Sequence, residues 1–182
     1  MHGPAVSGWL LVTLCGATGA YCLVRMRSCS GQAREAAGGE ALMGLGMAAM
    51  AVPAAVFALP RWVWVMYATV FGAAALRALL PARLSTHHLH HLVGSLAMVY
   101  MAVAMPSGAV AHAGHQAAGI PLLTGGLLAY YTVYVLRSGT RLAPLAAPAG
   151  GAAAASWGER PELAPACRLA MGLAMLAMLL TL

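Results

Sequence analysis

The residues of this sequence with the clearest potential for chemistry are its methionines and histidines, and both are clustered. The 182-residue chain has 12 methionines and seven histidines. Nine of the methionines form three triplets with helical spacing, which are Met43, Met47 and Met50; Met98, Met101 and Met105; and Met171, Met175 and Met178. At about 100° per residue, each triplet occupies one narrow face of a helix. Thioether sulfur is a soft ligand that suits Cu(I), so the triplets are candidate metal ligands.

The histidines lie on both sides of the second methionine triplet. Four lie shortly before it, at His87, His88, His90 and His91, two follow it, at His112 and His115, and the seventh is His2 near the N-terminus. If this stretch forms one helix, His87 and His91 lie on the same face as the methionine triplet. Imidazole ligates Cu, Zn and Fe. A single helix face would therefore offer imidazoles at one end and thioethers from its middle onwards.

Two hypotheses follow from these clusters. The first is copper binding or transport, with candidate ligands His87, His88, His90, His91, Met98, Met101, Met105, His112, His115, Met50 and Met175. Met-x-x-x-Met resembles, in spacing alone, the selectivity filter of Ctr-type copper importers. The second is a non-catalytic membrane partner subunit or sensor, in which methionine, a flexible gap-filler, only packs helices. A Leu-for-Met exchange separates the two hypotheses, because it conserves volume but removes the sulfur.

The spacing of the histidines does not fit the enzymatic metal sites that use histidine ligands. No catalytic residue is predicted. The two histidine clusters superficially resemble the histidine boxes of membrane di-iron oxygenases. The helix from His91 to Met105 would separate them by about 21 Å, which places them on opposite sides of a bilayer. A haem held by two histidines needs imidazoles on facing helices, and only one apolar stretch carries histidine. Copper is the only cofactor that the sequence indicates.

The composition predicts which elements must position these residues. The chain is 62% hydrophobic and 8% charged, with a mean hydropathy of +0.80. A soluble domain of this size cannot bury so much apolar surface. We therefore expect an all-α, polytopic transmembrane bundle, a single domain of six spans. The predicted spans are 4–24, 41–59, 62–80, 89–105, 119–136 and 165–182.

The arginines predict the orientation of these spans. With both termini outside, the inner loops 25–40, 77–88 and 137–168 hold nine of the ten arginines, as the positive-inside rule requires. The arginines flank apolar stretches, so the net charge of +6 indicates membrane orientation and not nucleic-acid binding. The expected location is the plasma membrane, with lipid and a further membrane protein as partners. The Ala/Gly/Pro-rich stretch 138–164 is predicted to be a flexible cytoplasmic linker.

Smaller features refine this prediction. The sixth span contains Arg168, whose side chain must reach toward the interface if the helix crosses fully. The spacing of Gly16 with Ala20, and of Gly44 with Ala48, favours close helix approach in lipid. Pro53 is expected to kink the second span. The four cysteines do not form a disulfide pattern and are expected to be reduced thiols.

Two stretches resemble a known family. They are GGEALMGLGMAAMAVPAAVF over residues 38–57 and HHLHHLVGSLAMVYMAVAMP over residues 87–106. Both are similar to an uncharacterised family of actinobacterial multi-pass membrane proteins of unknown function. The similarity extends over most of the chain and is weakest in the 138–164 linker. The resemblance implies a membrane location and transfers no functional residue.

Overall fold

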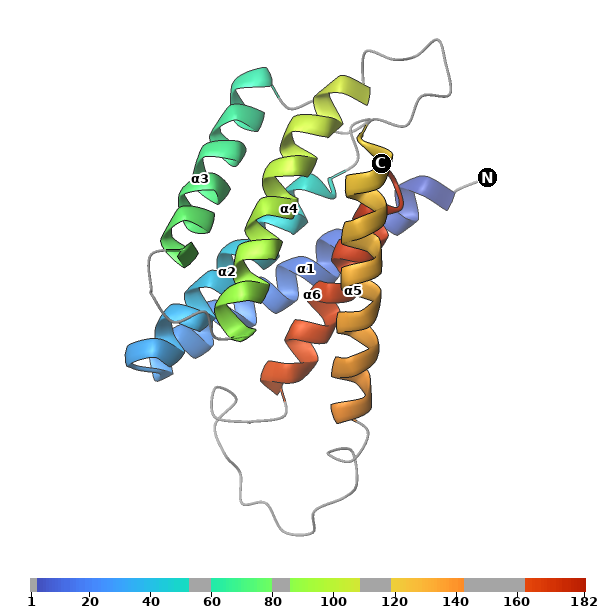
Figure 1. Ribbon diagram of the computed structural model, residues 1–182. Coiled ribbons are helices and arrows are strands. Elements are labelled where there is room, and N and C mark those ends of the chain that lie inside the picture. The colour runs from blue at the N-terminus through green and yellow to red at the C-terminus, as the bar shows by residue number, and fades with distance from the viewer. Residues whose placement is uncertain (1–2, 53–59, 80–85, 109–118, 143–162) are drawn as a thin grey trace. The chain divides into compact units, whose positions relative to one another are not determined.

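The computed structural model describes residues 3–52, 60–79, 86–108, 119–142 and 163–182. Within these ranges the chain forms six helices and no strand, so the predicted all-helical fold is confirmed (Figure 1). The helices are α1 (Gly3–Ser28), α2 (Gly31–Met50), α3 (Arg61–Leu79), α4 (Thr86–Gly108), α5 (Pro121–Leu142) and α6 (Leu163–Leu179).

The first connection differs from the expectation of a loop over residues 25–40. α1 continues to Ser28 and α2 begins at Gly31, so only two residues separate the helices. Gly31 has a φ of +56°, a left-handed conformation that glycine adopts without steric cost. Glu40, expected in this loop, therefore lies well inside a helix.

The later boundaries also differ in detail. α2 ends at Met50, and the following N–H, of Ala51, bonds back to the Met47 carbonyl. Pro53 lies outside the described residues. α5 extends to Leu142, into the stretch expected to be linker, and residues 143–162 lie outside the description.

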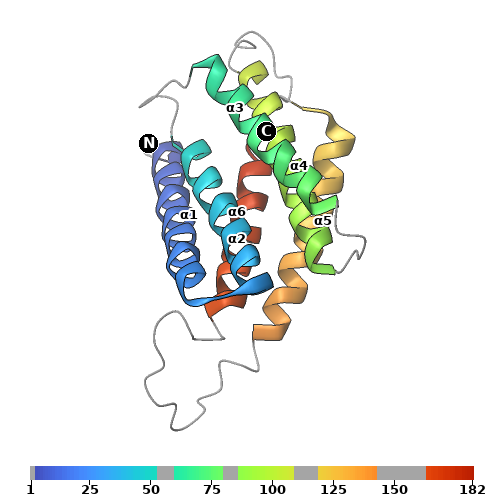
Figure 2. The same cartoon turned by 90° about the vertical axis from the view of Figure 1, so that its left-hand side faces the viewer.

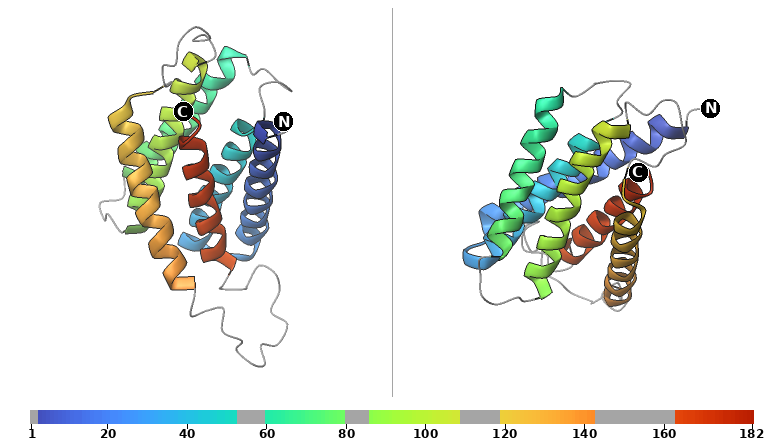
Figure 3. Two further views of the ribbon diagram at one scale, coloured as in Figure 1. Left: turned by 90° about the vertical axis from the view of Figure 1, so that its right-hand side faces the viewer. Right: turned by 45° about the horizontal axis from the view of Figure 1, so that its top comes forward.

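The contacts divide the chain into two compact units. Unit 1 contains α1, α2, α5 from Leu128 onwards and α6 up to Met178. Within it, α1 and α2 run antiparallel (Figure 2), whereas α2 and α6 run in the same direction (Figure 3). Unit 2 contains α3, α4 and the first turns of α5. In unit 2 the Tyr100 hydroxyl accepts a hydrogen bond from the Ile120 N–H at 2.9 Å and fastens α4 to the start of α5.

The backbones of α1 and α2 touch through glycine. A Cβ added to Gly44 would lie 3.0 Å from the Cα of Gly19 and 3.1 Å from the carbonyl oxygen of Cys15. Gly44 therefore mediates the close approach that its spacing predicts. Its partner on α1 is Gly19 and not Gly16, since a Cβ at Gly16 would meet nothing within 4 Å.

Side chains are distributed in the reverse of a soluble protein. The buried positions hold mainly alanine, methionine and cysteine, whereas large aliphatic side chains face outward. Leu10, Leu76 and Leu136, for example, are 64%, 65% and 64% exposed. By length and composition, two of the described helices could cross a membrane, α1 over Val6–Ser28 and α3 over Arg61–Leu79. The helices thus carry an outward apolar surface that water does not favour.

Candidate functional site

The described side chains of the methionine triplets are all buried. α2 buries Met43, Met47 and Met50; α4 buries Met98 and Met101; and α6 buries Met171, Met175 and Met178. Of the candidate ligands, Met50 and Met175 belong to unit 1, whereas Met98 and Met101 belong to unit 2. The side chain of Met105, also on α4, lies outside the description.

The histidines are only partly described. His90 and His91 are half-buried near the start of α4, with ring centroids 6.3 Å apart. The side chains of His87 and His88 lie outside the description, as does the segment 109–118 with His112 and His115. Among the described residues, no group of three or more His, Cys, Asp or Glu side chains is arranged to hold a metal ion.

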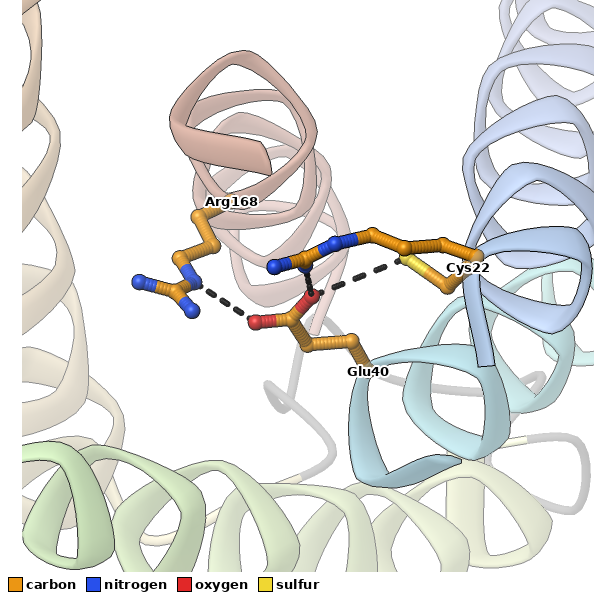
Figure 4. A network of polar contacts seen from close by, with 4 residues as sticks. Cys22, Glu40 and Arg168 are labelled. Atoms are coloured by element: carbon orange, nitrogen blue, oxygen red, sulfur yellow. Dashed lines mark hydrogen bonds and ion pairs between the residues drawn. The ribbon is translucent and has the colours of Figure 1, made fainter. Parts of the chain in front are cut away.

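The most developed polar site of unit 1 is centred on Glu40, a residue that sequence analysis did not select. The Glu40 residue is only 2% exposed. Its Oε1 accepts a hydrogen bond from Nε of Arg168 at 2.6 Å, and its Oε2 lies 3.5 Å from Nη1 of Arg25. The Cys22 thiol also donates to Oε2, at 3.7 Å (Figure 4). A single buried carboxylate therefore joins α1, α2 and α6.

Helical spacing explains this convergence. Cys22 and Arg25 are three residues apart on α1, so they share a face, which is turned toward α2. Arg168 is adjacent to Cys167 near the start of α6. The two guanidinium groups and one carboxylate leave one net positive charge in the cluster. The pairing satisfies a carboxylate whose burial alone would be costly.

Thiol and phenol groups surround the ion pairs. The Cys22 thiol contacts Glu40, and Cys167 directly precedes Arg168 on α6. The hydroxyl of Tyr21 is buried without a hydrogen-bond partner among the described residues. Tyr134 of α5 is close enough to Arg168 and Glu40 to interact electrostatically.

The ion pair between Glu40 and Arg168 also aligns the methionines of two helices. On α2, methionines stand three, seven and ten residues after Glu40; on α6, they stand three, seven and ten residues after Arg168. Because α2 and α6 run in the same direction, the methionines follow the ion-paired residue at the same sequence intervals on both helices. We name this set the methionine ladder, and it consists of Met43, Met47, Met50, Met171, Met175 and Met178.

The sequence contains a signal for the Glu40 cluster that composition alone does not emphasise. Arg168 is an arginine within an apolar stretch, and Glu40 is a glutamate directly before another. Charged residues at such positions are costly unless they pair with each other. Because Arg168 needs a counter-ion, Glu40 is a candidate partner for it. The numbers of histidines and methionines do not indicate this pair.

Comparison with known proteins gives a family without an assigned activity. One family model matches residues 32–182, a stretch that includes Glu40, Arg168 and the methionine ladder but not Cys22 or Arg25. No curated protein and no solved structure matches the chain. The chain belongs to the family described as Domain of unknown function (DUF5134).

Proposed function

We propose that the protein is a multi-pass protein of the plasma membrane, with six spans and both termini outside. The outward aliphatic side chains on all six helices support this proposal, because lipid is the solvent that favours them. The concentration of arginine in one set of connections supports the orientation.

The shorter apolar helices are compatible with crossing. α6 has 17 residues, which rise about 26 Å and approach the roughly 30 Å hydrocarbon core. The apolar part of α4 covers Leu89–Ala104. Spans slightly shorter than the core are accommodated by local thinning and by side chains that reach the interface. In α2 the charged residues are confined to the first half, and residues 53–59 beyond it lie outside the description.

Cysteine labelling tests the orientation. In a variant whose native cysteines are serine, single cysteines would replace Leu122 or Thr140, the exposed residues near opposite ends of α5. A membrane-impermeant maleimide on intact cells should label the cysteine at position 122. It should label the one at position 140 only after lysis. Labelling of position 140 from outside would overturn the proposed sidedness.

For the activity, we propose that the protein binds Cu(I) as a permease or a membrane metal-binding protein. The observation that supports this is the methionine ladder, six buried thioethers at matching positions on two helices of one unit. Thioethers are neutral and soft, so they can bind Cu(I) in a low-dielectric interior without adding charge. In the proposed orientation the ladder begins at the Glu40 cluster, on the cytoplasmic side, and leads outward.

The paired exchange of Met47→Leu and Met175→Leu tests the ladder. Both side chains are fully buried, and leucine conserves their volume, so the unfolding free energy should change by less than about 1.5 kcal/mol. Affinity for Cu(I) should fall about 10-fold or more, because two soft ligands are lost. Copper content would be measured by mass spectrometry on protein purified without a His-tag. Met66→Leu is the matched control, since Met66 is exposed on α3. Equal copper in all three proteins would contradict the proposal.

The alternative function is a non-catalytic partner subunit or sensor whose methionines pack helices. The complete burial of Met47 and Met175 in an Ala- and Gly-rich interior favours it equally well, since flexible methionine fills irregular space. This alternative predicts wild-type protein without copper and a partner recovered by mild detergent extraction.

A further inference from the structure

We propose that Arg25 and Arg168 bind the phosphate of an anionic phospholipid of the cytoplasmic leaflet. The site is the exposed side of the Glu40 cluster, which consists of Cys22, Arg25, Glu40 and Arg168. The inference rests on the proposed membrane location and orientation, and it is independent of copper binding.

The cluster holds its carboxylate inside and its arginines nearer the surface. The Glu40 side chain is only 3% exposed, whereas the side chains of Arg25 and Arg168 are 19% and 35% exposed. A ligand that approaches the cluster from outside the protein therefore meets guanidinium groups before it meets the carboxylate. The exposed side of the cluster favours an anion.

Most N–H groups of the two arginines have no acceptor among the described residues. Arg168 bonds to Glu40 through Nε, and its terminal nitrogens extend past the carboxylate (Figure 4). Arg25 approaches Glu40 through Nη1, at 3.5 Å. A guanidinium group has five N–H donors in one plane and binds phosphate oxygens in pairs. Both arginines therefore retain donors for a phosphate while they hold Glu40.

The charge of the cluster matches a phosphodiester. Two guanidinium groups and one carboxylate leave one net positive charge. The phosphodiester of a phospholipid carries one negative charge, so the occupied cluster would be neutral, which a partly buried site favours. A free phosphate ion is partly doubly charged near neutral pH and matches the cluster less closely.

The position of the arginines suits a lipid headgroup. Arg25 lies three residues before the end of α1, and Arg168 lies five residues after the start of α6. In the proposed orientation these two helix ends face the cytoplasm. On the membrane side of the arginines, the same helices expose Val24 and Leu173, which would contact the acyl chains. Basic sites between helices on the cytoplasmic side typically bind anionic headgroups.

Lipid retention, measured by native mass spectrometry, tests the site in the full-length protein. The protein would be reconstituted with equal amounts of phosphatidylglycerol and phosphatidylcholine, and wild type should retain phosphatidylglycerol preferentially. Arg25→Gln and Arg168→Gln should each weaken this retention about 10-fold or more, because hydrogen bonds to a charged group are lost. Arg27→Gln is the matched control, since Arg27 is an exposed arginine in the last turn of α1. It should weaken retention by no more than about 5-fold.

Glu40→Gln separates lipid binding from a purely structural role of the arginines. The amide keeps the shape of the carboxylate, and the cluster gains one positive charge. Retention of phosphatidylglycerol should therefore rise about 5-fold. Arginines that only hold the helices together predict no such rise. Equal retention in wild type, Arg25→Gln, Arg168→Gln and Glu40→Gln would overturn the lipid site.

The wild-type protein gives an answer even if the variants fail to fold. Retention of both lipids in equal amounts would overturn the site. Displacement of phosphatidylglycerol by an excess of inorganic phosphate would show that the site takes a free anion, and this result would overturn the lipid as its occupant. Cysteine labelling at positions 122 and 140 reports the orientation separately. Reversed labelling with phosphatidylglycerol still retained would overturn the leaflet and leave the phosphate contact intact.

Discussion

Replacing Glu40 with leucine is expected to destabilise unit 1 by about 3 kcal/mol. The carboxylate is the shared partner of Arg25 and Arg168, and its removal leaves two guanidinium groups without their counter-ion. Breaking a buried ion pair from one side costs roughly 3–5 kcal/mol. The arginine side chains are 19% and 35% exposed, so both can turn partly toward water, which places the expected loss near the lower limit.

The measurement is unfolding in mixed detergent micelles, with two comparisons. Glu35→Leu changes an exposed glutamate on the same helix and should cost no more than about 1 kcal/mol. The double variant Glu40→Leu with Arg168→Leu should be more stable than Glu40→Leu alone, because one unpaired charge is removed as well. The two residues would be shown not to interact if the double variant lost as much unfolding free energy as Glu40→Leu and Arg168→Leu lose together.

The helical fold is predictable from the sequence because its cause is local. Long apolar stretches and methionines at intervals of three and four are properties of neighbouring residues, and the helix from Arg61 to Leu79 follows directly from one such stretch. The direct passage from α1 to α2 is harder to predict. Gln32, Arg34 and Glu35 make the start of α2 polar, and a polar stretch between two apolar ones has the composition of a loop.

The candidate site is less predictable because it depends on distances along the chain of up to 128 residues. Each methionine triplet can be found on its own helix, but the correspondence between α2 and α6 depends on the ion pair that aligns them. Cys22 and Arg168 are 146 residues apart in the sequence, and only the fold of unit 1 brings both to the Glu40 carboxylate. A charged residue within an apolar stretch is the useful indication here, since its counter-ion has to come from another helix.

Substitution of Gly44 is expected to separate α1 from α2. A Cβ at this position would lie 3.0 Å from the backbone of Gly19, and backbone atoms cannot turn away as a flexible side chain does. Gly44→Ala should therefore cost about 1–2 kcal/mol and Gly44→Val about 3 kcal/mol, within the usual range for overpacking. Alanine also gains up to about 1 kcal/mol of helix propensity over glycine, so the measured loss for Gly44→Ala is net of that gain.

Gly16 provides the matched control for Gly44, because a Cβ there meets nothing within 4 Å. Gly16→Ala should leave stability unchanged or raise it by up to about 1 kcal/mol through helix propensity alone. The two Gly-to-Ala exchanges thus differ in sign although both glycines lie in small-residue spacings of the same helix pair. Gly44→Ala as stable as wild type would mean that α1 and α2 do not touch through their backbones. The Glu40 cluster, which depends on Cys22 and Arg25 reaching across from α1, would then lose its support.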